Sequence, residues 1–364
     1  MKIGITGLSN SGKTTVFNAL TGQNIETTAY ANSAGEPNMG MVKVPDSRID
    51  TLSGIFKPKK TVHSTVQYID YIGLTKGDMK QNKLVFEFIK DADALVHVVR
   101  AFQDDAVPHP LEKVAPLSDI ATVETELIFG DLELVERRLS GIETSIKKGK
   151  KPATDHEEKA LRKCIAALEA EKALRDVEFT AEDIAATRHL QFMSIKPMIV
   201  ALNIHEKDIG GEATAALIKE AEEYFRAKGS SATVLAMSGK VEMEIAELPA
   251  EEAAEFLKDL GIEEPALNRL IRHSYESVGL ISFFTVGEDE VRAWTIDRGD
   301  SALEAAGKIH SDIQRGFIRA ETVSYEDFME AGTLAACRDK GTMRLEGKTY
   351  EVRDGDIINF RFNV

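Results

Sequence analysis

Short apolar runs alternate with longer polar or amphipathic stretches over the first two thirds of the chain. The runs that have the length and composition of strands are 3–6, 39–44, 66–69, 95–99, 198–202 and 233–237. Several of them are apolar throughout, which is typical of strands buried on both faces of a sheet. Helical stretches lie between many of them, so the pattern predicts βαβ units and a mainly parallel sheet.

The middle of the chain interrupts this pattern with a long helical stripe. Apolar residues recur there at spacings of four and three, as in a heptad seam, at Ile128, Leu132, Val135, Leu139, Ile142 and Ile146. The helix breakers Gly149 and Pro152 follow, and a second stripe starts at Leu161. We therefore predict an antiparallel helical coiled-coil hairpin inserted at 128–193. It serves either as a solvated structural arm or as a partner-binding arm with a basic tip.

The last part of the chain changes character near residue 280. Strand-like runs occupy 281–286, 291–296, 316–323 and parts of 343–364, and 302–310 is helical. Short strands around a few helices predict a small α+β domain at 280–364. The α/β domain is then expected at 1–127 and 194–278, on either side of the helical insertion.

Composition and charge narrow the classes of protein that remain. The chain has 364 residues, enough for two or three domains, and a formal net charge of −15, which disfavours non-specific binding to DNA. No apolar run is long enough to span a membrane, and the N-terminal run is too short for a signal peptide. Two distant cysteines, Cys164 and Cys337, form no disulfide framework. We expect a cytoplasmic protein without a membrane partner, and the oligomeric state stays open.

The strongest chemical signal is a phosphate-binding motif at residues 7–14. The sequence Gly-Leu-Ser-Asn-Ser-Gly-Lys-Thr fits G-x-x-x-x-G-K-[ST], follows the first strand directly and precedes an apolar helix. Glycines allow backbone N–H groups to surround phosphate oxygens, and the helix N-terminus adds positive charge. Lys13 is predicted to reach the β- and γ-phosphates, and the Thr14 hydroxyl to bind Mg²⁺. The predicted phosphate contacts are Asn10, Ser11, Gly12, Lys13, Thr14 and Thr15.

A second element of a P-loop NTPase lies at the end of a later strand. Asp70 and Gly73 form D-x-x-G after the run 66–69. In this order along the chain, Asp70 is the second predicted Mg²⁺ ligand, and Gly73 is expected next to the γ-phosphate.

A third element follows the strand at 198–202 and is expected to contact the base. GTPases carry N-K-x-D there, whereas this chain has Asn203, Ile204 and Glu206. Glu206 is one methylene longer than aspartate, so its fit to guanine is not guaranteed. An asparagine amide matches the edge of adenine, which makes Asn203 the candidate base reader. Ser238 follows the next strand, where the last base-contacting loop belongs.

Taken in order, these motifs resemble the YchF / Obg-like ATPases over nearly the whole chain. Further blocks that carry the resemblance are 36–38, 70–77, 97–100, 125–127, 291–296, 316–320, 354–356 and 359–364. The resemblance implies an Obg-type G domain, a coiled-coil insertion and a C-terminal TGS domain of β-grasp type. It also implies ATP preferred over GTP, hydrolysis of ATP, and association with ribosomes.

The same resemblance suggests two further roles. Leu74 stands where many GTPases have a glutamine that orients water, and the family's proposed substitute is a loop histidine, which His109 matches. With an unperturbed pKa near 6.5, a histidine suits that task, so His109 is a candidate catalytic residue beside Lys13. Asn10 resembles the asparagine that helps related NTPases hold a monovalent cation, K⁺.

The chain departs from the family's pattern near the switches. Ala34 stands where the family has a threonine that contacts Mg²⁺ and the γ-phosphate, and alanine has no oxygen to donate. We therefore expect ATP binding with slow hydrolysis. The alternatives are a nucleotide-binding adaptor with very low turnover, and a true GTPase or GTP-dependent nucleic-acid-binding protein. Lysines at the tip of the predicted hairpin are candidate RNA contacts, with a solvated loop as the alternative: Lys147, Lys148, Lys150 and Lys151.

Overall fold

The computed structural model describes residues 1–26, 37–149, 155–230 and 232–363. The chain divides into two compact units, which we describe separately. The first comprises 1–42 and 67–274, and the second comprises 43–66 and 275–364. Within the described part of the chain, no helix has the length and apolar character needed to cross a membrane.

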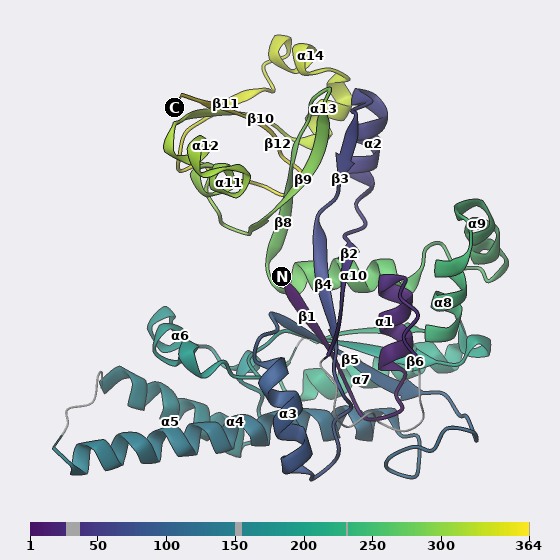
Figure 1. The fold of residues 1–364 in the computed structure, drawn as a ribbon, viewed down its shortest axis with the longest axis vertical. Helices are drawn as coiled ribbons and strands as arrows, with labels where there is room; N and C mark the ends of the chain where they lie inside the picture. The colour runs from purple at the N-terminus through teal and green to yellow at the C-terminus, as the bar shows by residue number, and fades with distance from the viewer. Residues whose placement is uncertain (27–36, 150–154, 231, 364) are drawn as a thin grey trace. The chain divides into compact units, whose positions relative to one another are not determined.

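A six-stranded sheet forms the centre of the first unit (Figure 1). Its strands are β1 (Lys2–Thr6), β2 (Asn38–Lys43), β4 (Thr65–Asp70), β5 (Ala94–Ala101), β6 (Met198–Ile204) and β7 (Thr233–Met237), in the order β2-β4-β1-β5-β6-β7. The pairs β4–β1, β1–β5, β5–β6 and β6–β7 are parallel. The six strands predicted from the apolar runs are confirmed, and the sheet is mainly parallel, as predicted. The carboxyl ends of the parallel strands β4, β1, β5, β6 and β7 meet at one edge, where open α/β sheets place their ligands.

Helices cover both faces of this sheet. They are α1 (Lys13–Thr21), α3 (Met79–Ile89), α7 (Glu212–Ala227) and α10 (Ala266–Ser277). Helix α8 (Gly239–Glu247) packs against α1, and α9 (Ala250–Asp259) packs against α8. On one face, Ile69 and Leu95 pack with Phe86 of α3. On the other, the Tyr68 hydroxyl donates to Ser274 of α10 at 3.0 Å. Apolar side chains on both faces explain why the strands lack a polar alternation.

Two long helices extend from the first unit. Helix α4 (Pro116–Lys147) lies beside α5 (Asp155–Glu169), as Figure 1 shows. Most of the predicted stripe is buried between them, where Val135, Leu139 and Ile142 pack against Leu161 and Cys164, but Ile146 at the end of the stripe is exposed. Helix α4 begins at Pro116, twelve residues before the expected start of the insertion, because its first turns pack on the sheet through Ile120 and Val123. The chain then continues through η1 (Leu174–Asp176), α6 (Ala181–Thr187), η2 (Arg188–Leu190) and, after β6, η3 (Glu206–Asp208).

The second unit contains another six-stranded sheet, in the order β11-β10-β12-β8-β9-β3. Its elements are β3 (Lys60–Val62), β8 (Leu280–Thr285), β9 (Glu290–Asp297), β10 (Phe317–Val323), β11 (Arg344–Glu346), β12 (Ile357–Phe362), α2 (Ser47–Phe56), α11 (Ala302–Ile309), α12 (Ser311–Arg315), α13 (Tyr325–Ala331) and α14 (Leu334–Asp339). Strands β8–β9, β10–β12 and β10–β11 are antiparallel, whereas β3 pairs with β9 in parallel. The α+β character predicted for the tail is confirmed.

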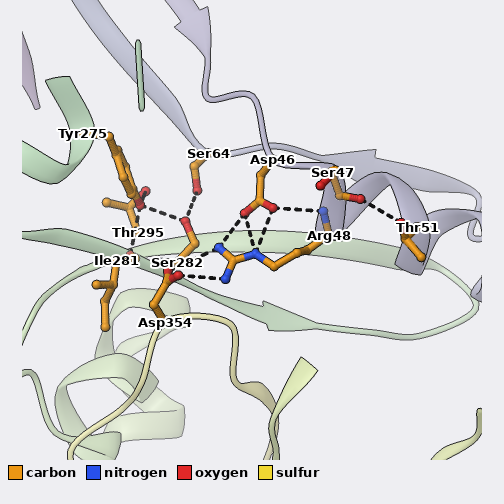
Figure 2. A network of polar contacts seen from close by, with 10 residues as sticks. All are labelled: Asp46, Ser47, Arg48, Thr51, Ser64, Tyr275, Ile281, Ser282, Thr295 and Asp354. Carbon is orange, nitrogen blue, oxygen red and sulfur yellow. Dashed lines mark hydrogen bonds and ion pairs between the residues drawn. The ribbon is translucent and has the colours of Figure 1, made fainter. Parts of the chain in front are cut away.

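Residues 43–66 are where the observed units differ from the expected boundaries. The sequence placed them in the first α/β domain, but α2 and β3 pack with the C-terminal strands. Arg48 fixes this segment, because its guanidinium donates to Asp46 at 2.9 Å and to Asp354 at 2.7 Å (Figure 2). Asp354 also accepts from the Ser282 N–H at 2.9 Å. Charge-assisted bonds to two carboxylates make Arg48 the main polar anchor of this segment.

Candidate functional site

The phosphate-binding motif connects β1 to α1 at the carboxyl edge of the first sheet. Gly7 has φ +143° and Gly12 has φ +91°, conformations that disfavour a side chain. A Cβ on Gly7 would lie 2.4 Å from the Val98 carbonyl oxygen, and one on Gly12 would lie 2.2 Å from Asn203 Nδ2. The loop therefore needs glycine at both positions to keep its backbone in place.

Lys13, Thr14 and Asp70 form one connected polar cluster at this loop. Lys13 Nζ donates to the Leu8 carbonyl at 2.7 Å, and Thr14 Oγ1 donates to Asp70 Oδ2 at 2.8 Å. Burial lowers the pKa of Lys13 to about 8, although the Asp70 charge works in the opposite direction. Burial likewise raises the pKa of Asp70, against the effects of the Thr14 bond and the Lys13 charge. Burial therefore disfavours the charged forms of both Lys13 and Asp70 in this arrangement. A ligand that carries negative phosphates and a positive metal ion would stabilise both charges.

The donor set fits a phosphate-bound magnesium ion. Asp70 Oδ1 is buried and makes no hydrogen bond within the described chain, and it adjoins the hydroxyl of Thr14. A carboxylate and a hydroxyl are the hard oxygen ligands that Mg²⁺ takes from a P-loop protein, with phosphate oxygens and water supplying the others. No group of three or more acidic, histidine or cysteine side chains in the described residues could hold a metal by itself.

The segment after Asp70 is bonded directly to the phosphate loop. The Leu74 N–H donates to the Gly7 carbonyl at 2.9 Å. A Cβ on Gly73 would lie 2.6 Å from the Ser9 backbone nitrogen. The structure therefore brings Gly73 to the phosphate loop, where close backbone contact requires a glycine. Its contact with a γ-phosphate stays a prediction.

Asn203 connects the phosphate loop to the start of α8. Its Nδ2 donates to the Ser11 carbonyl at 3.0 Å, and its Oδ1 accepts from the Gly239 N–H at 3.0 Å. Ser238 occupies the N-cap position of α8 next to this contact, without a capping bond from its side chain. The observed role of Asn203 is to tie these loops together, and base reading by its remaining donor and acceptor capacity stays a prediction.

The other two residues predicted near the base have different surroundings. Ile204 is buried in an apolar cluster with Ala221 and Phe225, so its side chain belongs to the core and only its backbone remains for a ligand. Glu206 is partly exposed and pairs with Lys240 at 2.8 Å, and that hydrogen bond lowers the pKa of Glu206. A base that used Glu206 would compete with Lys240 for it.

His109 has both ring nitrogens engaged. Nδ1 accepts from the Leu111 N–H at 3.2 Å, which makes Nε2 the protonated nitrogen, and Nε2 donates to Asp119 Oδ2 at 3.0 Å. Its side chain is 4% exposed. The expectation of a histidine available to water is not met in this conformation, so a catalytic role requires the loop to move.

The loop that carries His109 is tied to its surroundings at several points. Asn10, at φ +61°, donates from Nδ2 to the Pro108 carbonyl at 3.0 Å. The buried guanidinium of Arg100 donates to the carbonyls of Phe102, Asp104 and Val107 at 2.9–3.1 Å. Sequence reasoning gave Arg100 no role, although it lies in a motif block that carried the resemblance.

The families and relatives that this chain matches are consistent with a phosphate-binding site at this loop. Residues 2–129 match a family model described as "50S ribosome-binding GTPase", and residues 280–363 match YchF-GTPase_C, described as a protein of unknown function (DUF933). The chain is 44% identical to the "Ribosome-binding ATPase YchF" of Bacillus subtilis (strain 168), over 99% of each chain. The chain belongs to the YchF family.

Other members of the YchF family support the assignment at the level of sequence and fold. The "Ribosome-binding ATPase YchF" of Escherichia coli O157:H7 is 42% identical, over 100% of this chain and 99% of that one. The solved structure of the Schizosaccharomyces pombe YchF GTPase aligns with a TM-score of 0.84 at 29% identity, covering 99% and 97% of the two chains. The chain thus has the P-loop α/β fold of a YchF protein together with its C-terminal domain.

Two groups of predicted residues lie outside the described residues, one in the first switch and one at the hairpin tip. Ala34, the departure in the first switch, falls within 27–36, and Lys150 and Lys151 fall within 150–154. Of the candidate RNA contacts, Lys147 and Lys148 are described and lie at the end of α4.

Proposed function

We propose that this chain is a Mg²⁺-dependent ATPase whose nucleotide state regulates association with the ribosome. The proposal rests on the cluster of Lys13, Thr14 and Asp70 at the carboxyl edge of the parallel strands. The loop beside this cluster requires glycine at two positions to keep its backbone in place. The names of the Bacillus subtilis and Escherichia coli relatives give the same nucleotide and the same partner.

The residues of the loop would divide the work on ATP. Backbone N–H groups around Gly12, with the α1 N-terminus, would surround the phosphates, and Lys13 would pair with the β- and γ-phosphates. Thr14 and Asp70 would hold Mg²⁺, which supplies positive charge that neutralises phosphate oxygens when it is bound. His109 would orient the attacking water after it leaves Asp119.

We propose ATP rather than GTP as the preferred nucleotide. Guanine recognition needs a carboxylate that accepts two hydrogen bonds, and Glu206 is both longer than aspartate and paired with Lys240. The Glu206–Lys240 ion pair is open to solvent, so it contributes little free energy and a bound base can displace Lys240. The relative affinities for ATP and GTP therefore decide between the two nucleotides. A GTPase would bind GTP more tightly than ATP on the same sample.

We further propose slow basal hydrolysis. Ala34 removes an oxygen that the family uses at the γ-phosphate, and His109 is engaged by Asp119. Single-turnover phosphate release should be slower than that of the Bacillus subtilis relative measured beside it, and Lys13→Ala should abolish it. Equal rates would contradict slow hydrolysis. If ATP binds tightly but release stays negligible with and without ribosomes, the adaptor function is correct instead.

The tip of the helical hairpin, where α4 ends, is the proposed ribosome contact. It belongs to a proposed domain plan of G domain, helical insertion and TGS domain. Lys147 and Lys148 lie there, and each lysine that binds RNA phosphate should contribute about one unit of salt dependence. The double change Lys147→Glu/Lys148→Glu should weaken co-sedimentation with ribosomes. The control is Lys219→Glu, an exposed lysine on α7. Unchanged pelleting of the double variant would remove this contact from the proposal.

A further inference from the structure

Helix α4 carries four buried carboxylates, each bonded to a different segment of the first unit. They are Asp119, Glu124, Glu126 and Asp131, and all are at most 5% exposed. Buried carboxylates are costly unless they are bonded, so each one marks a contact that fixes a neighbouring segment to α4. Helix α4 therefore fixes the positions of several neighbouring segments, in addition to packing on the sheet.

The spacing of these carboxylates sorts them into two pairs. Asp119 and Glu126 are seven residues apart, as are Glu124 and Asp131, and a separation of two helical turns places each pair on one face. Glu124 pairs with Arg175, and Asp131 accepts from the N–H groups of Met193 and Ser194. That pair therefore fixes the chain that returns from the helical arm.

The other pair holds two loops of the nucleotide site. Asp119 accepts from His109, and Glu126 accepts from the Gly77 N–H at 2.7 Å and from Asn82 Nδ2 at 2.9 Å. Gly77 lies in the segment that follows Asp70 and Gly73. One face of one helix thus contacts both the histidine loop and the segment next to the phosphates.

Asp119 is the least satisfied member of this group. Its Oδ2 bonds to His109, but its Oδ1 is buried and has no hydrogen-bond partner among the residues that the structure describes. Asp131, in contrast, uses both oxygens, for Met193 N and for the backbone and hydroxyl of Ser194. A buried carboxylate oxygen without a partner costs free energy in the state that buries it. The arrangement in which Asp119 bonds to His109 is therefore the least stabilised of the four contacts.

We propose that Asp119 is a positioning residue that holds His109 in a resting conformation, and that a shift of α4 releases the histidine to act on ATP. The inference rests on the proposed function, because it assigns His109 a role in hydrolysis. It follows from geometry, since His109 has no ring nitrogen free for water while it bonds to Leu111 and Asp119. Because Glu126 is on the same face, the same shift would reposition the segment at Gly77.

The test is single-turnover ATP hydrolysis by Asp119→Asn in the full chain, with ATP affinity measured separately. An asparagine keeps the shape but removes the charge that strengthens the bond from His109. We expect the rate of phosphate release to rise about three- to tenfold, the effect of losing most of one hydrogen bond, with unchanged ATP affinity. Adding His109→Ala should remove the gain, because the freed histidine produces it.

The matched control is Asp131→Asn, which makes the same chemical change at a buried position of the same helix. It should lower the unfolding midpoint without raising the rate. A gain in Asp131→Asn, a gain that survives His109→Ala, or no gain in Asp119→Asn would each overturn the proposal. If Lys13→Ala abolishes hydrolysis while His109→Ala has no effect, the ATPase function stands and this inference fails.

A measurement on the unaltered protein covers the case in which Asp119→Asn does not fold. Nitrogen NMR of the histidine rings should show His109 without nucleotide as the Nε2–H tautomer, with that proton protected from exchange. An Nδ1–H ring, or an Nε2–H that exchanges as in free histidine, would contradict the resting contact.

Discussion

Binding of Mg·ATP should draw a proton onto Lys13. Burial lowers the pKa of this ammonium to about 8 in the nucleotide-free protein. The negative phosphates favour the charged form, so they should return the pKa toward its ordinary value near 10.4. At pH 8 about half of the free protein lacks this proton, whereas nearly all of the complex carries it. We therefore expect uptake of about 0.5 proton per ATP at pH 8, about 0.1 at pH 7 and about 0.9 at pH 9.

The sign of the pH dependence follows from the same shift. Affinity should be nearly constant below pH 7 and should fall as pH rises above 8, approaching a tenfold loss per unit. Calorimetric titrations in buffers with different ionisation enthalpies measure the uptake directly. Lys13→Arg, which stays charged throughout, is the control and should show none of it. Uptake near zero at both pH 8 and pH 9, or release of a proton, would refute the account of Lys13.

Three further outcomes follow from single contacts. Gly12→Ala places a Cβ 2.2 Å from Asn203 Nδ2 at φ +91°, so it should weaken ATP binding at least about tenfold, and unchanged affinity by titration would contradict the steric argument. Asn203→Ala, which removes both bonds between the loops, should do the same while unfolding remains cooperative in urea. Arg48→Ala should destabilise the second unit by about 1.5–3 kcal/mol in urea unfolding, because charged hydrogen bonds to Asp354 are lost, and an unchanged midpoint would show that the anchor is unimportant.

Sequence patterns predicted those features that depend on local chemistry. The six strands of the first sheet were found because strands buried on both faces are apolar along their whole length. The phosphate loop is predictable because its glycines, lysine and threonine all fall within residues 7–14 and each has a local requirement. Helix α2 also carries a local signal, because Ile49, Leu52 and Phe56 lie on one face and Asp46 stands at its N-terminus.

The features that escaped prediction depend on contacts between distant or irregular segments. No local pattern indicates that β3 pairs with β9, because register between segments so far apart is set by the folded sheet. The sequence indicates His109 as a candidate but does not indicate its partner. Nothing in the sequence distinguishes Asp119 from an ordinary acidic residue in the first turn of a helix. Arg100 and Glu126 lay in motifs that carried the resemblance, yet their roles emerged only from the backbone groups that they bind.

The most direct test of the account is an equilibrium titration of the purified chain with ATP and with GTP, each with and without Mg²⁺, alongside Lys13→Ala. We predict Mg²⁺-dependent binding, tighter for ATP than for GTP, that is lost in Lys13→Ala while the variant stays folded. If neither nucleotide binds, or if Lys13→Ala binds as tightly as the unaltered chain, the phosphate loop is not the nucleotide site.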